Sequence, residues 1–214
     1  MTKRVLRFAP SPTGYLHVGN IRTALFNYLQ AKKTGGEFIL RLDDTDRERS
    51  SQYFIDHIKT DLDWLGINWD RIEQQSLRIE RYRDVLTKLS EKNVVYECFE
   101  TSSELEIKRK KQQKRGLPPV YDREALKLSV AEKDALRNKI CSHWRFLLSG
   151  KNVTWHDEIA GEINVRTSAV SDPILVKGNG QFLYTLASVI DDSDFGVTDV
   201  LRGIDHLTNT AVQI

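Results

Sequence analysis

A histidine and a glycine stand where an apolar strand pattern gives way to a helical one. The stretch RFAPSPTGYLHVGN, residues 7–20, opens like a buried strand and breaks at its two prolines before the helix. A helix N-terminus exposes unpaired N–H groups and about half a positive charge, which suits a phosphate. Gly19 would let such a ligand approach the backbone, and His17 would add a hydrogen bond. These two residues predict a phosphate site, with a plain helix cap as the alternative.

Alternating strand and helix patterns place this pair at the edge of a sheet. Apolar runs predict strands at residues 5–8 and 37–42. A 3.6-residue periodicity predicts a helix over residues 17–33 that ends at Gly35. This order favours a parallel sheet with right-handed crossovers, in which ligands bind beyond the carboxyl ends of the strands. The buried stripe of the helix is expected to consist of Ile21, Leu25 and Leu29.

The pattern changes for part of the chain and then resumes. Residues 101–116 predict a basic helix, with Ser103 and Glu106 in capping-box spacing. Residues 173–186 predict a hairpin that turns at its GNG triplet, and residues 196–203 predict a later strand between two helices. We therefore expect one α/β domain interrupted by an insertion, with the boundaries 1–95, 96–180 and 181–214.

The composition is that of an ordinary soluble protein. The 214 residues are 40% hydrophobic and 29% charged, and a net charge of +2 argues neither for nor against a nucleic-acid partner. Cys98 and Cys141 have neither disulfide-framework nor zinc-finger spacing. The start of the sequence, MTKRVLRFAPS, lacks the apolar core of a signal peptide, and no run approaches the about 20 apolar residues of a membrane span. We expect a cytoplasmic protein that does not enter a membrane, with its four tryptophans in the core.

Several segments resemble one enzyme family. HVGN at residues 17–20 is similar to the HIGH signature of class I aminoacyl-tRNA synthetases, and RFAPSPTGYLHVGNIRTAL resembles the glutamyl-tRNA synthetases specifically. Further matches follow in order: RLDDTDRERS (41–50), SDPILVKGNGQFLYTLASVIDD (171–192) and VLRGIDHLTNTAVQI (200–214). The resemblance implies an α/β, Rossmann-like nucleotide-binding fold of the HIGH type with a parallel sheet. It also implies that the insertion is an α+β domain that binds the acceptor end of tRNA.

The resemblance assigns roles to individual residues. His17, Gly19 and Asn20 would form the catalytic signature, with His17 and Gly19 binding the ATP phosphates and stabilising charge at the α-phosphate. Arg7 would pair with the side-chain carboxylate of glutamate, because a planar guanidinium suits a planar anion. Further implied positions are Ser11 and Asp43 at the α-ammonium, Tyr184, Ser188 and Arg202 in the rest of the amino-acid pocket, Asp205 at the ATP ribose, and His206 at the adenine.

Some of these positions have structural alternatives or depart from the family pattern. Asp43 could belong to a solvated loop with internal salt bridges, Ser11 to a turn, and Tyr184 to the core. Asp43 also stands where the family usually has Glu, which shortens its reach by one methylene. Ser188 stands where some relatives use Asn, and Ile204 where many carry Glu.

The insertion has features of its own. The run KRKKQQKRG (108–116) is expected either to contact an RNA phosphate backbone or to form a solvated helix face. Some relatives bind structural zinc in this region, but only Cys98 is nearby in this sequence and three further ligands are not evident. We therefore predict no zinc and no other metal site in the protein.

The resemblance implies a glutamate–tRNA ligase. ATP, with Mg²⁺, would activate L-glutamate to glutamyl-adenylate, and a monomeric enzyme would transfer the glutamyl group to the 3′ end of tRNA(Glu). No segment resembles the KMSKS-like loop or the helical anticodon-binding domain, so we expect an N-terminal catalytic portion that is not fully active alone. Alternatives are an enzyme that also charges tRNA(Gln), a glutamyl-queuosine tRNA(Asp) synthetase, a small-molecule nucleotidyltransferase with the HIGH-type fold, and a catalytically inactive tRNA-binding fragment.

Overall fold

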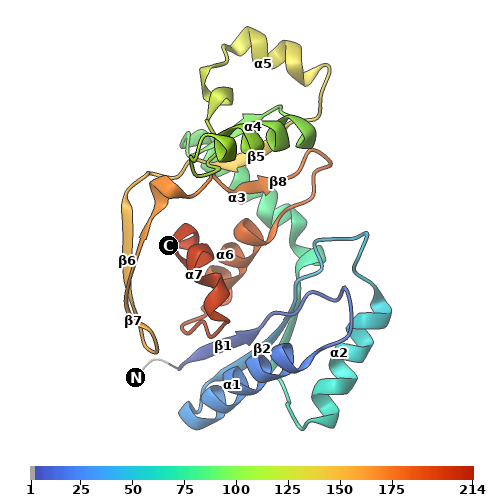
Figure 1. Ribbon diagram of the computed structural model, residues 1–214. Helices are drawn as coiled ribbons and strands as arrows, with labels where there is room; N and C mark the ends of the chain where they lie inside the picture. The colour runs from blue at the N-terminus through green and yellow to red at the C-terminus, as the bar shows by residue number, and fades with distance from the viewer. Residues whose placement is uncertain (1–2) are drawn as a thin grey trace. The chain divides into compact units, whose positions relative to one another are not determined.

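The computed structural model describes residues 3–214, which divide into two compact units (Figure 1). The first unit runs to Arg83 and includes Leu186–Asp205. The second unit consists of Asp84–Thr185 and His206–Ile214. The chain therefore leaves the first unit after Arg83 and returns to it at Leu186, and each unit has a sheet of its own.

The first unit contains a three-stranded parallel sheet in the order β1-β2-β3, which confirms the predicted fold class. Its strands are β1 (Val5–Phe8), β2 (Glu37–Leu42) and β3 (Arg71–Gln74). Its helices are α1 (Val18–Thr34), α2 (Gln52–Trp64), the 3-10 turn η1 (Gln75–Arg78), the start of α3 (Ile79–Glu91), and α6 (Tyr184–Asp194) from Leu186 onward. The third strand was not predicted, because its sequence RIEQ is short and mostly polar.

The two faces of this sheet differ, because successive side chains of a strand point to opposite sides. One face is apolar and packs against α1 and α2. Its core consists of Leu6, Phe8, Phe38, Leu40 and Leu42 from the strands with Ala24, Ala31, Ile55, Ile58 and Leu62 from the helices. On the other face, Arg7 and Arg41 are 5% and 1% exposed and bind a carboxylate of α6. The sheet therefore places two buried arginines opposite an acidic helix.

The buried side of α1 differs from the predicted stripe. Leu25 and Leu29 are 41% and 51% exposed, whereas Ala24 and Ala31 are 0% and 1% exposed. Asn27 is also fully buried, and its amide donates two hydrogen bonds to backbone carbonyls. The sheet-facing side of the helix is thus lined by small residues, which permit close approach of the helix to the strands. The leucine periodicity was real, but the helix is rotated so that alanines face the sheet.

The second unit contains an antiparallel sheet in the order β4-β5-β8 and a separate hairpin of β6 and β7. Its strands are β4 (Val95–Cys98), β5 (His143–Phe146), β6 (Asn152–Asp157), β7 (Gly161–Arg166) and β8 (Ile174–Val176). Its helices are α4 (Ser102–Lys114), η2 (Glu124–Lys127), α5 (Val130–Arg137), η3 (Thr167–Ala169) and α7 (Leu207–Gln213), and the turn η4 (Ile204–His206) spans the boundary.

The basic helix α4 has the predicted capping box, but two residues earlier in the chain. Thr101 is the N-cap, and its Oγ1 accepts a hydrogen bond from the Glu104 N–H at 3.3 Å. Glu104 Oε2 accepts from the Thr101 N–H at 2.7 Å in return. The prediction of Ser103 and Glu106 as the capping pair is therefore wrong. Both pairs have the same spacing, and the preceding strand ends early enough for Thr101 to serve.

Two further local predictions have different outcomes. Residues 196–203 form no strand, contrary to expectation, because the N–H groups of Thr198 and Asp199 both donate to the carbonyl of Val5. The Thr198 hydroxyl accepts from the Val5 N–H at 2.8 Å, so this segment ends the edge of β1 with a side chain instead of a ladder. The predicted turn at the GNG triplet is present, and Val176 bridges Phe182 across it.

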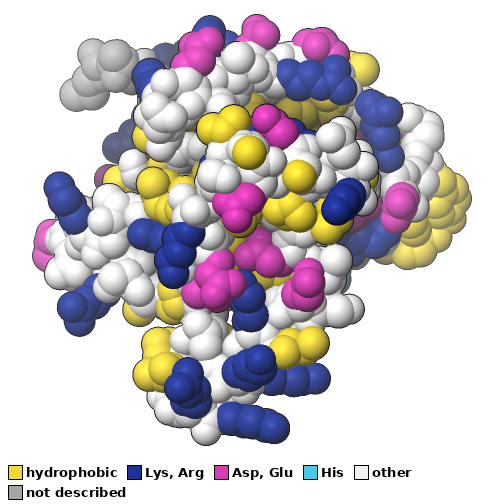
Figure 2. Space-filling model, turned by 90° about the horizontal axis from the view of Figure 1, so that it is seen from above, with side chains coloured by type: hydrophobic (Ala, Val, Ile, Leu, Met, Phe, Trp, Pro, Cys, Tyr) yellow, Lys and Arg dark blue, Asp and Glu magenta, His cyan; other side chains and the backbone are white. Residues whose placement is uncertain are grey.

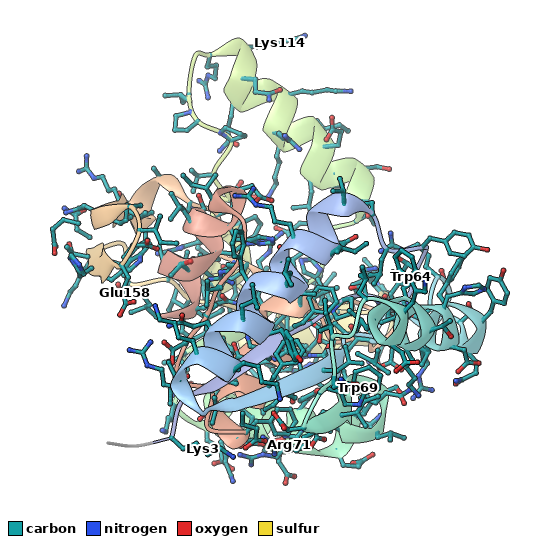
Figure 3. All side chains as sticks on the ribbon, turned by 90° about the horizontal axis from the view of Figure 1, so that it is seen from below. Lys3, Trp64, Trp69, Arg71, Lys114 and Glu158 are labelled. Carbon is teal, nitrogen blue, oxygen red and sulfur yellow. The ribbon has the colours of Figure 1, made fainter. Side chains whose placement is uncertain are left out.

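The tryptophans are not all buried. Trp64, at the end of α2, is 84% exposed, so its assignment to the core is wrong (Figure 3). Trp69 is partly buried and packs against the apolar core of the first unit. No helix within residues 3–214 is long and apolar enough to span a bilayer.

Candidate functional site

The helix mouth that the sequence singles out is the capped first turn of α1. His17 is the N-cap, and its Nδ1 accepts a hydrogen bond from the Gly19 N–H at 3.1 Å. Asn20 Oδ1 accepts from the His17 N–H at 3.2 Å, which completes a capping box. The structure therefore brings His17, Gly19 and Asn20 together, and it shows that His17 does cap the helix.

This cap also decides which ring nitrogen of His17 can donate. Because Nδ1 accepts a hydrogen bond, it carries no proton, and the neutral ring must carry its proton on Nε2. His17 is exposed, so Nε2–H is available to a ligand. A Cβ on Gly19 would lie 2.9 Å from His17 Cε1. Gly19 therefore makes room for the capping ring itself, in addition to any ligand.

On the other face of the sheet, two arginines bind three aspartates. Arg41 donates from Nε to Asp43 at 2.6 Å and from Nη1 to Asp192 at 2.6 Å. Arg7 donates from Nε to both oxygens of Asp192, at 3.1 and 3.2 Å. Asp191 lies 3.9 Å from Arg41 Nε. We call Arg7, Arg41, Asp43, Asp191 and Asp192 the arginine–aspartate cluster.

Burial and neighbouring charges shift the pKa values of Arg41, Asp43 and Tyr82. Burial raises the pKa of Asp43 above its ordinary value, although the charge of Arg41 opposes this shift. Burial opposes the charge of Arg41, but the charge of Asp43 outweighs it and raises the pKa of Arg41 above its ordinary value. Asp191 is fully buried and accepts from Arg78 Nε at 2.7 Å and from the Tyr82 hydroxyl at 2.9 Å. Burial, with the nearby charge of Asp191, raises the pKa of Tyr82, so the tyrosine stays a donor. Every buried charge here has a hydrogen-bonded partner, as burial requires.

The other predicted site residues are spread over both units. Ser11 is exposed in the loop after β1, and Ser188 is buried on α6 at 1% exposure. Arg202 and Asp205 belong to the first unit, where a Cβ on Gly203 would lie 2.2 Å from Asp205 Oδ1. Tyr184 and His206 belong to the second unit, with ring centroids 6.1 Å apart. Of the proposed glutamate ligands, the structure joins only Arg7 and Asp43 in the cluster.

Sequence reasoning missed Arg41, Asp191 and Asp192 as members of the cluster. A signal for Arg41 existed, since an arginine at an inward position of the apolar run EFILRL needs a partner. The acidic pair at residues 191–192 directly follows the apolar part of α6, and Asp191 is 0% exposed. Charged residues that directly follow an apolar run of a helix are the signal that could have identified this pair.

The second unit contains a group of possible metal ligands. Ligand atoms of Cys98, Glu100 and His143 lie within 4.8 Å of one another. Glu100 Oε2 and His143 Nε2 are buried with no hydrogen-bond partner among residues 3–214. Glu100 Oε1, however, accepts from the Tyr121 hydroxyl at 2.7 Å and lies 3.3 Å from the Lys108 ammonium. The structure thus supplies two candidate ligands that the sequence did not make evident.

We predict that the purified protein contains much less than one equivalent of zinc. Three ligands fall short of the four that structural zinc sites use, and the Lys108 ammonium already neutralises Glu100. Burial raises the pKa of the Cys98 thiol to about 11, which disfavours the thiolate that zinc needs. Elemental analysis of the protein after dialysis against a chelator is the measurement. A retained equivalent that disappears in Cys98→Ser but not in Cys141→Ser would contradict the prediction.

Comparisons with known proteins identify the family to which this sequence is similar. The family model for the catalytic domain of class I tRNA synthetases (E and Q) matches residues 3–214. Glutamate–tRNA ligase 1 of Roseobacter denitrificans is 60% identical over 97% of this chain and 47% of its own length. Glutamate–tRNA ligase 1 of Ruegeria pomeroyi is 59% identical over 100% of this chain and 48% of its own length. The chain thus spans about half the length of these relatives.

A solved structure has the same fold. The crystal structure of a glutamate tRNA ligase from Elizabethkingia meningosepticum, in complex with its amino acid, superimposes with a TM-score of 0.90. The two sequences are 33% identical, over 99% of this chain and 46% of that one. The parallel sheet and the capped HVGN helix agree with these matches, which together assign the chain to a family. The chain belongs to the class I tRNA synthetases of the E and Q type and carries their catalytic-domain sequence.

Proposed function

We propose that the protein is a glutamate–tRNA ligase that activates L-glutamate with ATP and passes the glutamyl group to tRNA(Glu). The observation that carries this proposal is Arg7, a guanidinium buried in a strand of the sheet whose following loop leads to the HVGN helix. Relatives named glutamate–tRNA ligase that are 60% and 59% identical to this chain support the proposal. We further propose that the enzyme works in the cytoplasm as a monomer.

The helix mouth would serve the ATP phosphates. The backbone N–H groups of the first turn, the helix dipole and the His17 Nε2–H donor together favour negative charge. When the α-carboxylate of glutamate attacks the α-phosphorus, charge grows on the phosphate oxygens before pyrophosphate leaves. A donor held rigidly by the capping box stabilises that charge without reorganising. ATP would bring Mg²⁺ as part of the substrate, and Asp205 and His206 are the proposed ribose and adenine contacts.

The arginine–aspartate cluster would serve the amino acid. Arg7 would bind the side-chain carboxylate of glutamate, and Asp43 and Ser11 the α-ammonium. Both Asp43 oxygens accept from Arg41, at 2.6 and 3.1 Å, but a carboxylate offers about four acceptor positions. Asp43 therefore keeps capacity for an ammonium group. Tyr184, Ser188 and Arg202 remain proposed parts of the same pocket.

The second unit is the proposed binding region for the tRNA acceptor end. Lys and Arg side chains gather at the end of α4 that carries Lys114 (Figure 2, Figure 3). Lys108 is not part of this surface, because it forms ion pairs with Glu100, Asp122 and Glu124. Lys110 likewise pairs with Glu106, at 3.6 Å. We propose that the phosphate contacts come from the remaining basic residues, which are Arg109, Lys111, Lys114 and Arg115.

Amino-acid-dependent ATP–pyrophosphate exchange by the complete gene product tests the proposal. Exchange should require L-glutamate, with L-glutamine and L-aspartate as matched controls that differ by one charge or one methylene. Exchange supported equally by all three amino acids, or by none with tRNA(Glu) present, would contradict the proposal.

A further inference from the structure

A single carboxylate on α6 is shared by the two buried arginines of the sheet. Asp192 accepts from Arg7 Nε at 3.1 and 3.2 Å, and from Arg41 Nη1 at 2.6 Å. The side chain of Asp192 is 21% exposed, compared with 6% for Arg7 and 1% for Arg41. Asp192 is thus more exposed than the two arginines that it binds.

The guanidinium of Arg7 is occupied on one edge only. Its Nε–H is taken by Asp192, whereas neither Nη group has a hydrogen-bond partner among residues 3–214. Neither Nη atom is among the fully buried unpaired atoms of the described chain, so the little exposure that Arg7 has includes this end. The two Nη groups can therefore present a fork of parallel N–H donors, the arrangement that binds a carboxylate bidentately.

The Asp192 carboxylate is itself held in place by contacts on several sides. Arg41 binds Asp192 through Nη1 and Asp43 through Nε and Nη2. These bonds hold its guanidinium in one orientation. The adjacent residue of α6, Asp191, is bound by Gln75, Arg78 and Tyr82 at 2.7–3.0 Å. These contacts fix α6 against β2, η1 and α3, and with it the position of the Asp192 carboxylate.

We propose that Asp192 is a positioning residue, which holds Arg7 through Nε so that its Nη fork meets the side-chain carboxylate of glutamate at one distance and angle. This inference rests on the proposed function of Arg7 and adds the residue that sets its geometry. The bond to Nε stops rotation of the guanidinium about its last single bonds. Without it, a long flexible side chain would sample several orientations and pay rotamer entropy on binding.

Charge and geometry predict opposite effects, which makes the proposal testable. Asp192 partly neutralises Arg7, so removing its charge should strengthen attraction for any anion. In Asp192→Asn only one neutral oxygen remains to accept hydrogen bonds from Arg7 and Arg41, so the guanidinium of Arg7 is held less firmly. A misplacement of about 1 Å can cost on the order of 10²-fold. If positioning dominates, the loss falls on L-glutamate, whose carboxylate must reach Arg7 while its ammonium group is held elsewhere. Discrimination against the shorter L-aspartate should then decline as well.

The test measures dissociation constants for L-glutamate, L-aspartate and ATP with the complete gene product and its variants. Asp192→Asn should weaken L-glutamate binding at least about tenfold and narrow its preference over L-aspartate, with ATP binding changed less than about twofold. Asp194→Asn is the matched control, because it lies on the same helix and binds Arg78 and Arg81 instead of Arg7. It should leave both amino-acid constants unchanged. Asp192→Glu keeps the charge, so it should recover the melting temperature but only part of the affinity.

Each other outcome decides against the inference. L-glutamate binding that is unchanged or tighter in Asp192→Asn would show that charge outweighs positioning. Equal weakening in Asp192→Asn and Asp194→Asn would show a general structural role of α6. If Asp192→Asn does not fold, Asp192→Glu provides the test, because its added methylene displaces the carboxylate that binds Arg7. Unchanged affinity for L-glutamate in Asp192→Glu would then overturn the proposal. Failure of the unaltered protein to bind L-glutamate would instead overturn the proposed function, and this inference with it.

Discussion

Arg7→Ala should lower kcat/KM for glutamate by about 10⁴-fold in ATP–pyrophosphate exchange, because a site built to pair with a charged group loses its binding partner entirely. The loss should exceed that of a surface ion pair, since Arg7 is 5% exposed and water cannot replace the guanidinium fully. The dissociation constant of ATP should change by less than about threefold, because the helix mouth of α1 is left intact.

Arg7→Lys is the matched control for this change. It keeps the positive charge but replaces the planar fork with a point charge, so it should fall between the alanine variant and the unaltered protein. Stability must be followed alongside, because Asp192 loses one of its two arginine partners in either variant. Glutamate-dependent exchange at the unaltered rate in Arg7→Ala would contradict the assignment of Arg7 to the substrate carboxylate.

The parts of the fold that follow from local pattern were predictable. β1, β2 and α1 could be placed because apolar runs, two prolines and a glycine stop mark their ends. The rotation of α1 was not, because a helix with leucines and alanines at different phases can present either side. What selects the alanine side is how closely the helix can lie on the sheet, which is a property of the tertiary structure.

The candidate site was predictable only where one segment contains the chemistry. His17, Gly19 and Asn20 are neighbours in sequence, and the cap that joins them is local. The arginine–aspartate cluster joins Arg41 to Asp192 across 151 positions of the chain. The pattern of β2 shows that Arg41 needs a carboxylate, but it does not show which one. That choice depends on how α6 returns to the sheet after the whole second unit.

The role of Asp43 could not be assigned from the sequence for a similar reason. The family resemblance implied a ligand for an ammonium group, and the residue pattern allowed a solvated loop with internal salt bridges. The structure shows a salt bridge with Arg41, but Asp43 is buried and not solvated. The salt bridge and a role as ammonium ligand are compatible, because a buried carboxylate held by one guanidinium is pre-oriented for a second cation. A residue on a face shared by a ligand and a neighbouring side chain cannot be assigned from sequence to only one of them.

His17→Ala should impair the helix mouth in two ways. This change removes the Nε2–H donor, which should raise the barrier to adenylate formation by about 2–4 kcal/mol by comparison with loss of one oxyanion donor. It also removes the N-cap, which should lower stability by about 0.5–2 kcal/mol. Exchange, single-turnover transfer of preformed glutamyl-adenylate to tRNA, and thermal melting should be measured together. Transfer should suffer less than exchange.

The structure supplies a control that separates these two contributions. Asn is among the best N-cap residues, so His17→Asn should keep the hydrogen bond to the Gly19 N–H and the melting temperature while losing the outward donor. If phosphate binding is the role of His17, exchange should be nearly as low in His17→Asn as in His17→Ala. Exchange at the unaltered level in His17→Asn would mean that the histidine serves the helix alone.

Gly19→Val should combine both defects by displacing the ring. Its Cβ would lie 2.9 Å from His17 Cε1 and 3.1 Å from Nδ1, so the imidazole must leave the cap. The branched side chain would also cover the N–H groups at the helix mouth. Adding His17→Asn to Gly19→Val should then cost little further exchange, because the ring is already out of place. If the fold losses of exchange in the two single variants multiply in the double variant, Gly19 and His17 act independently.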